Sequence, residues 1–350
     1  MAEPDEHAYA DSDVPWEEEE LDENESEYFS TDYGAPAHSA NENMTDALRF
    51  NGEKFIIAAQ YIAKQRAKLH HQLRVMTSTL ASGGESTSGA DSYIVNLQNL
   101  EQYIIQHEQE LIEFVIGTNM YIEDYHGHGE EWIGTHARHT VTLADQDYFK
   151  PYDDRVVYQR TAVAGDGHCG YRAPALRLLG DESLWPALRL VSLHASIHSD
   201  EYSVIELHEG TTATYEEIIQ NESQMDLDEY LQGLLSAAGE RAGIWELVAI
   251  SKLMQTTVLI FVEDQDSKQL FPRAYVENGK FKTLPQSASD LLSPNESLWV
   301  ARIGKGPAEF HWDPLDLGPL DASGTRRGRE SMPADVSAAT LPRISGDLMS

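Results

Sequence analysis

The stretch VVYQRTAVAGDGHCGYRAPALRLL, residues 156–179, decides the fold of the second half of the chain. It passes from a strand-like run through a glycine-rich loop into an apolar run typical of a helix. Two later runs are typical of strands: TTVLIFV at 256–262 is β-branched, and LWVARI at 298–303 alternates. Strands separated by a long helical region predict an α+β domain at 155–320, in which helices flank a mixed sheet.

Composition and charge exclude several classes of protein. The chain has 350 residues, and its formal net charge of −34 opposes binding of a phosphate backbone, so we expect no nucleic-acid partner. A lone cysteine cannot form an intramolecular disulfide or a multi-cysteine zinc site, which favours a reducing compartment. The first residues have no signal-peptide pattern, and no apolar run is long enough to span a bilayer. We therefore expect a cytoplasmic or nuclear protein that does not bind membranes.

Both ends of the chain have compositions typical of disorder. Residues 1–46 hold 16 acidic residues and no Lys or Arg, so burial cannot offset the entropy cost of ordering them. Residues 321–350 are rich in Ser, Ala, Gly and Pro and have no periodic apolar residues. The sequence therefore predicts a disordered acidic tail at 1–46 and a second disordered tail at 321–350.

Residues 47–118 contain two amphipathic stretches of opposite charge. The first, around Phe55 and Ile62, has apolar residues at helical spacing with basic residues between them. The second, from Leu97 to Phe114, keeps a three-four spacing beside acidic residues. These patterns predict an antiparallel helical hairpin or coiled coil, through which the protein could self-associate.

Residues 119–154 are predicted to be a polar connecting segment. Four histidines in this segment lie among acidic residues, and both residue types can bind metals: His126, His128, His136 and His139. Their spacing fixes no tetrahedral site, and the chain supplies no cysteine to join them here. We favour a polar loop over a metal site and expect no metal.

Cys169, the single cysteine, lies in a glycine-flanked loop directly before a helical run. Gly165 and Gly167 permit a tight turn whose backbone amides can approach a substrate oxygen. The unpaired N–H groups and the positive dipole end of the helix start favour a thiolate. With an imidazole nearby, such a cysteine can be a nucleophile at neutral pH. Taken by itself, a single cysteine can equally be an inert core residue.

His311 is the leading candidate for the base that a cysteine nucleophile needs, which usually lies far away in sequence. It follows the strand-like run LWVARI, in the segment His311-Trp312-Asp313. Residues two apart on an extended segment point to the same side, so Asp313 can hold the imidazole in its useful tautomer. Cys169, His311 and Asp313 together predict a Cys-His-Asp site.

These segments resemble the ovarian tumour (OTU) family of cysteine proteases, most of which cleave ubiquitin from proteins or ubiquitin chains. Three motifs match in order. An Asp-Gly-x-Cys motif followed by an aromatic residue and Arg stands at 166–172, a Trp-x-x-x-Ala helix at 245–249 leads into a strand, and a closing His-aromatic-Asp stands at 311–313. The resemblance covers about residues 155–320 and does not extend to residues 1–150.

The resemblance implies a cysteine-dependent deubiquitinase that needs no metal or organic cofactor. It makes Cys169 the nucleophile, His311 the general base and then acid, and Asp313 the residue that orients His311. Asp166 belongs to the same site, where Asp166 and Gly167 shape the loop whose amides, with that of Cys169, form the oxyanion hole. The implied partners are ubiquitin or a ubiquitin-like modifier and ubiquitinated proteins.

Two departures and two alternatives accompany this resemblance. Gly170 stands where many family members have a bulky apolar residue, and Pro174 lies early in the expected helix, which could start late or bend. One alternative is an OTU-fold protein that binds ubiquitin without useful turnover. The other is an assembly protein whose working element is the helical region at 46–117.

Overall fold

The computed structural model describes residues 40–82, 90–120, 122, 136–150, 155–207, 210–236, 242–287, 290–292, 294, 296–304 and 310–319. The tail predicted at 321–350 lies outside these residues. So does the tail predicted at 1–46, except for 40–46, where a helix has already begun. From Arg49 onward the chain forms one compact unit. No helix within the described ranges is both long and apolar enough to cross a membrane.

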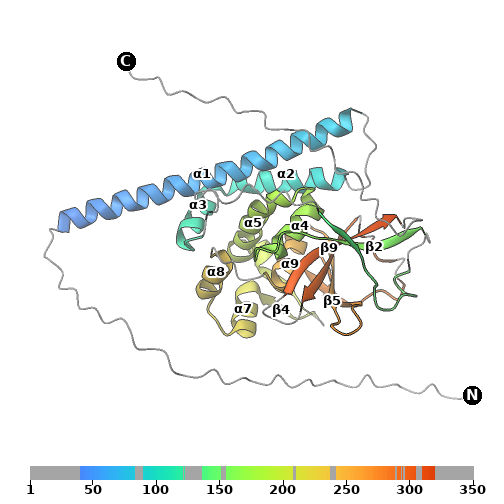
Figure 1. Cartoon of the computed structure of the whole chain (residues 1–350). Helices are drawn as coiled ribbons and strands as arrows, with labels where there is room; N and C mark the ends of the chain where they lie inside the picture. The colour runs from blue at the N-terminus through green and yellow to red at the C-terminus, as the bar shows by residue number, and fades with distance from the viewer. Residues whose placement is uncertain are drawn as a thin grey trace, which may run out of the picture. The chain divides into compact units, whose positions relative to one another are not determined.

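Helices occupy the first part of the described chain and then alternate with strands (Figure 1). They are α1 (Ala40–Ala81), α2 (Ala90–Gln106), α3 (Glu108–Gly117), α4 (Cys169–Leu179), the 3-10 turn η2 (Glu182–Leu184), α5 (Trp185–His198), α6 (Asp200–Ser203), α7 (Tyr215–Ser223), α8 (Leu227–Leu235) and α9 (Ile244–Leu253). The local sequence explains where α7 begins. At α7 the hydroxyl of Thr214 accepts the amide of Glu217 at 3.1 Å, and the Glu217 carboxylate accepts the amide of Thr214.

The described strands form one sheet in the order β1-β2-β9-β8-β5-β6-β7-β3-β4. Their bounds are β1 (Arg138–Thr140), β2 (Val156–Thr161), β3 (Val204–Glu206), β4 (Thr212–Thr214), β5 (Thr257–Glu263), β6 (Leu270–Glu277), β7 (Lys280–Lys282), β8 (Leu298–Gly304) and β9 (Phe310–Pro319). β5 and β8 run parallel, whereas β9 runs antiparallel to both β2 and β8. The sheet is therefore mixed and flanked by helices, which confirms the fold class predicted from the sequence.

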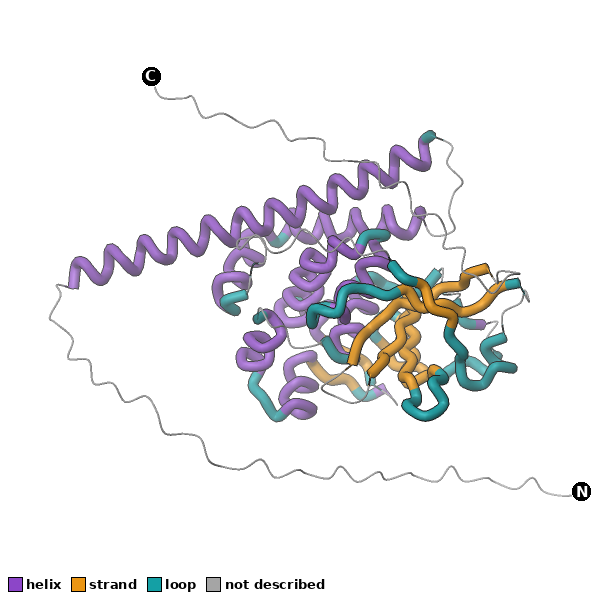
Figure 2. The backbone as a smooth tube through the Cα atoms, viewed as in Figure 1, coloured by secondary structure: helices purple, strands orange, loops and turns teal. Residues whose placement is uncertain are grey.

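The side chains of β5 alternate between two hydrophobic cores. Val258 and Ile260 pack in the larger core with residues of α4, α5 and α9, while Leu259 and Phe261 pack in a second core on the opposite face. Figure 2 shows the helices gathered beside the strands of the sheet. Because both faces of β5 are buried, its sequence is continuously apolar instead of alternating.

Part of the segment predicted to be a polar connection belongs to the folded unit. β1 pairs with β2, and the side chains of Leu143 and Phe149 lie in the second core. The ring of Phe149 meets that of Trp299 edge-on, with centroids 6.1 Å apart. Because these apolar side chains pack on the second face of the sheet, this part of the segment is not the purely polar connection that the sequence predicts.

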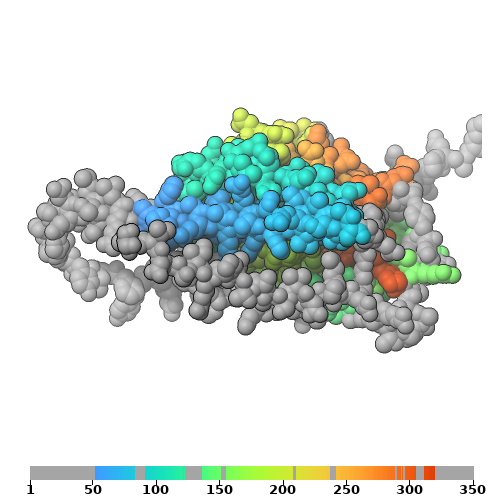
Figure 3. Space-filling view, turned by 90° about the horizontal axis from the view of Figure 1, so that it is seen from above, coloured from blue at the N-terminus to red at the C-terminus, as the bar shows by residue number. Residues whose placement is uncertain are grey.

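α2 runs back alongside α1, as Figures 1 and 3 show. The two helices are joined by a hydrogen bond between His70 Nδ1 and Glu101 Oε1, 3.0 Å apart. Buried residues of both helices, Ile62 and Leu69 on α1 and Leu97 on α2, belong to the same core as α4 and α5. The helical region thus packs on the helix that begins at Cys169, while its self-association stays a prediction.

Candidate active site

Cys169 is the first residue of α4, where the loop after β2 turns into the helix. Gly167 has a φ of +91°, a conformation that residues with a Cβ rarely adopt, so the turn requires glycine. The amides of Tyr171 and Arg172 both donate to the carbonyl oxygen of His168, at 2.9 and 3.0 Å. The amide of Cys169 therefore lies in the first helical turn, where the helix supplies no acceptor.

β9 carries the other two residues of the predicted Cys-His-Asp site on one face. His311 Nε2 lies 2.9 Å from Asp313 Oδ1. The carboxylate of Asp313 is almost fully buried, and it also accepts the amide of Val163 and one guanidinium N–H of Arg160, each at 3.1 Å. These bonds fix Asp313 so that one oxygen faces His311.

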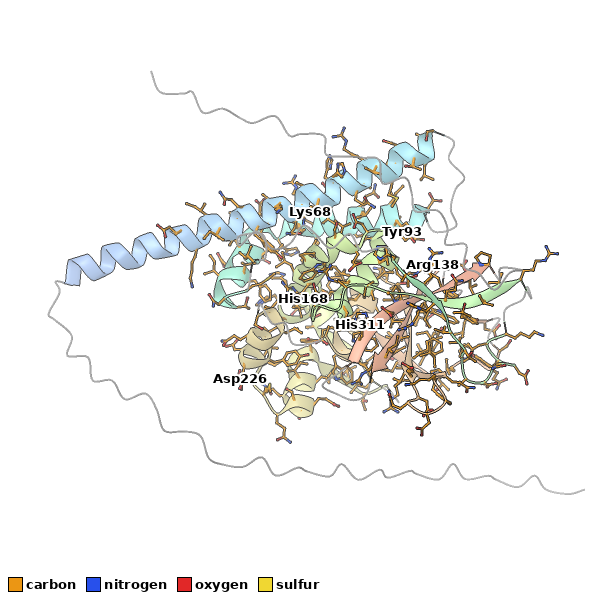
Figure 4. The ribbon with its side chains drawn as sticks, viewed as in Figure 1. Lys68, Tyr93, Arg138, His168, Asp226 and His311 are labelled. Atoms are coloured by element: carbon orange, nitrogen blue, oxygen red, sulfur yellow. The ribbon has the colours of Figure 1, made fainter. Side chains whose placement is uncertain are left out.

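Cys169 lies close enough to His311 that its side chain contributes to the pKa of the imidazole. Since Asp313 occupies Nε2, the ring nitrogen left for the thiol is Nδ1, which faces the loop: a Cβ built on Gly165 would lie 3.8 Å from it. His311 and the neighbouring His168, labelled in Figure 4, lie where the helices meet the sheet. The structure thus places Cys169 near His311 and joins His311 to Asp313 by a hydrogen bond.

The environment of His311 favours its protonated form. Burial lowers the pKa of His311, but the hydrogen bond and charge of Asp313, together with the nearby Cys169, raise this pKa to about 10. A protonated imidazole between a carboxylate and a sulfur is the partner that stabilises a thiolate. This arrangement can supply a nucleophile and a proton donor at neutral pH.

Asp166 stands beside this group and is engaged by other partners. Its carboxylate accepts the amide of His168 at 3.1 Å and forms a bidentate ion pair with Arg172, whose Nε lies 3.0 Å from Oδ1. Burial raises the pKa of Asp166, but these bonds outweigh it and leave the pKa below its usual range. Asp166 therefore holds the turn that carries Gly167.

The structure explains the departure at Gly170 and shows where Pro174 lies. A Cβ on Gly170 would lie 2.4 Å from the Cβ of Ala242, so a larger residue does not fit there. Ala242 also accepts the indole N–H of Trp312 at 2.8 Å. α4 starts at Cys169 and not later, and Pro174 lies inside it, where it removes one helical hydrogen bond.

Sequence reasoning missed Arg160 and Glu182, which bind residues of the predicted site. Arg160 binds Asp313 from 153 residues away in sequence, and Glu182 binds Arg172 at 3.3 Å. Nothing in the local sequence marks either residue, because their partners depend on which strands and turns are neighbours. Arg160 can be identified as a partner of Asp313 only when the pairing of β2 with β9 is known.

The histidines considered as metal ligands do not form a site in the described structure. His126 and His128 lie outside the described residues. His136 Nδ1 lies 3.4 Å from Glu182 Oε2, and His139 lies in β1. Within the described ranges, no three side chains of His, Cys, Asp or Glu gather closely enough to hold a metal ion.

Comparisons with known proteins give similarity at the level of solved structures. No protein-family model matches the chain, and no curated protein matches it either. The chain is similar to the structure of the OTUD1 OTU domain, with 16% identity over 45% of this chain and 85% of that one, and a TM-score of 0.30. It is similar to the viral OTU domain protease from Farallon virus, with 20% identity over 48% of this chain and 96% of that one, and a TM-score of 0.30. An OTU domain in complex with ubiquitin has 15% identity over 51% of this chain and 76% of that one, and a TM-score of 0.28.

Proposed function

We propose that the protein is a cysteine-dependent hydrolase that cleaves isopeptide bonds at the C-terminus of ubiquitin or a ubiquitin-like modifier. The observation that carries this proposal is the hydrogen bond between His311 and the buried Asp313, with the imidazole beside Cys169 at the start of a helix. An inert core cysteine needs neither a protonated imidazole partner nor a buried carboxylate behind that imidazole. The substrate class rests on the motif resemblance of residues 166–172, 245–249 and 311–313.

The proposed reaction begins with attack of the Cys169 thiolate on the carbonyl carbon of the terminal glycine. The new C–S bond gives a tetrahedral intermediate with a negatively charged oxygen. His311 then donates its Nδ1 proton to the leaving lysine amine as the C–N bond breaks, which leaves a thioester on Cys169. In the second half His311 takes a proton from water, the resulting hydroxide attacks the thioester, and the thiolate leaves.

Each neighbouring group supports one step of this reaction. Asp313 holds the ring of His311 through Nε2, which leaves Nδ1 for the reacting groups, and its charge stabilises the imidazolium. The amide of Cys169 lies in the first turn of α4, where it is available to the oxyanion. Asp166 keeps the turn at Gly167 in the conformation that presents the loop amides.

The experiment that tests this proposal uses ubiquitin carrying a C-terminal electrophile. We expect the full chain to form a covalent adduct, seen as a mass shift, and the Cys169→Ala variant to form none. His311→Ala should slow adduct formation strongly, because it removes the proposed base and proton donor. His198→Ala is the matched control, since His198 is exposed on α5 and packs against Phe114 and His194, away from the site.

Three results would contradict the proposal. The first is a folded wild-type chain that reacts with none of several modifier probes. The second is an adduct that survives in Cys169→Ala. The third is binding of ubiquitin without any adduct, which would favour the alternative of an OTU-fold binding protein.

A further inference from the structure

The loop between β2 and α4, residues 162–168, has three backbone amides bound by three different carboxylates. The amide of Val163 donates to Asp313 and that of His168 to Asp166, each at 3.1 Å. Between them, the amide of Ala164 donates to Glu182 Oε1 at 3.0 Å. Among the described residues, the amides of 165–167 and of Cys169 have no acceptor, so these are the donors left for a substrate oxygen.

Glu182 reaches the same loop by a second route. Its side chain is 8% exposed, and Oε1 also accepts Arg172 Nη1 at 3.3 Å. Arg172 in turn holds the carboxylate of Asp166, which binds the amide of His168. Glu182 therefore binds the start of the loop directly, at Ala164. It is connected to the end of the loop, at His168, through Arg172 and Asp166.

The residue at the start of α5 supports the loop beside Glu182. The ring of Trp185 stacks on that of His168, with centroids 4.2 Å apart and planes at 15°. The guanidinium of Arg172 lies 5.0 Å from the centroid of the same indole. Glu182 thus contacts the loop through its carboxylate and Trp185 through its ring. Arg172 contacts both of these side chains.

We propose that Glu182 is a positioning residue: it fixes the loop 162–168 in the conformation that presents its unpaired amides to the oxyanion. The inference rests on the proposed function, because these amides serve catalysis only if Cys169 attacks a carbonyl. Glu182 has no contact with Cys169 or His311 among the hydrogen bonds of the described residues, so it acts on the loop and not on the nucleophile.

Two reactions of Cys169 distinguish an effect on the loop from an effect on the nucleophile. Hydrolysis passes through an oxyanion and depends on the loop amides. Alkylation by iodoacetamide forms a C–S bond while iodide leaves, so it depends on the thiolate and develops no oxyanion. A residue that only positions the loop should therefore affect hydrolysis and leave alkylation nearly unchanged.

The test compares Glu182→Ala and Glu182→Gln in the full chain, with a ubiquitin C-terminal fluorogenic amide as substrate. Loss of one oxyanion donor costs roughly 10²-fold in kcat, which is the fall expected for Glu182→Ala. Glu182→Gln keeps an oxygen that can accept the amide of Ala164, so we expect a smaller fall of about 10-fold. In both variants KM and the alkylation rate should stay within about 2-fold of the wild type, because neither depends on the oxyanion donors.

Glu222→Gln on α7 is the matched control, because Glu222 is exposed and should leave both reactions unchanged. Equal loss of hydrolysis and alkylation at an unchanged melting temperature would overturn the inference, as would unchanged hydrolysis. If Glu182→Ala does not fold, Glu182→Gln decides alone by the same criteria.

If the wild-type chain hydrolyses no ubiquitin substrate, the proposed function fails, and hydrogen exchange then decides the positioning role. The amide of Ala164 should exchange faster in Glu182→Gln than in the wild type, because its acceptor is weakened. Exchange at the wild-type rate would overturn the inference.

Discussion

Gly170 is the residue of the site where substitution has the most direct structural consequence. It follows Cys169 in α4, and a Cβ at this position would lie 2.4 Å from Ala242 Cβ, 3.2 Å from Ala242 O and 3.3 Å from Ala242 Cα. Overpacking of this kind costs about 1–3 kcal/mol, whereas Gly→Ala inside a helix gains up to about 1 kcal/mol. We expect Gly170→Ala to lower the free energy of unfolding by about 1–2 kcal/mol, or the melting temperature by roughly 2–8 °C.

The same substitution should impair the site, because Ala242 also binds the indole of Trp312, next to His311. Pushing Ala242 away from α4 changes the distance between Cys169 and His311, and small misplacements of reacting groups cost up to about 10²-fold in rate. We expect the alkylation rate of Cys169 in Gly170→Ala to fall at least about 10-fold.

A double-mutant cycle tests this reasoning. Ala242→Gly removes the atom at 2.4 Å and leaves only the contacts at 3.2 and 3.3 Å. The double variant should therefore recover part of the stability and rate lost in Gly170→Ala, with a coupling energy of about 1 kcal/mol or more. Urea unfolding and alkylation kinetics measure the two quantities.

Gly52→Ala is the matched control, because Gly52 is helical in α1 and a Cβ there would meet nothing within 4 Å. It should stabilise the chain slightly. The reasoning is refuted if Gly170→Ala behaves like Gly52→Ala, or if the effects of Gly170→Ala and Ala242→Gly simply add.

Three further predictions concern charged and titratable groups. Asp313→Asn removes a charge that raises the pKa of His311, which must be protonated to donate to the leaving amine, so the alkaline limit of ubiquitin-amide hydrolysis should move to lower pH; an unmoved limit would contradict this. Arg160→Gln leaves the buried Asp313 without its guanidinium partner and should cost about 2 kcal/mol of unfolding free energy in urea, with a smaller loss for Arg160→Lys. Burial and the nearby charge of His198 lower the pKa of His194 to about 4, so between pH 6.5 and 4 the unfolded chain binds a proton that the folded chain does not. The free energy of unfolding should therefore fall by up to about 2 kcal/mol across this window, and the fall should be smaller in His194→Gln; equal slopes would disprove the assignment.

The sequence predicts most of what lies close together along the chain. The glycines around Cys169 and the helical run after it indicate the loop and helix that the structure shows. The two-residue spacing of His311 and Asp313 is enough to place both on one face of a strand. In these cases the physical cause is local: a positive φ at Gly167, or the alternation of an extended chain.

What the sequence does not predict depends on contacts between distant segments. Arg160 meets Asp313 only because β2 pairs with β9, and that strand order has no local signature. Gly170 has no room for a larger side chain because Ala242, which is distant in sequence, lies against it. Periodicity identifies α1 and α2 as amphipathic helices, but it does not reveal that their apolar faces pack into the core shared with α4.

The central claim is that Cys169 turns over a ubiquitin-type substrate with the help of His311. Hydrolysis of a ubiquitin C-terminal fluorogenic amide by the full chain, beside Cys169→Ala, His311→Ala and the control His198→Ala, tests this claim most directly. We expect multiple turnovers for the wild type and for His198→Ala, and none above background for Cys169→Ala and His311→Ala. Turnover that persists in Cys169→Ala, or a folded wild-type chain without turnover of any ubiquitin-like substrate, would contradict it.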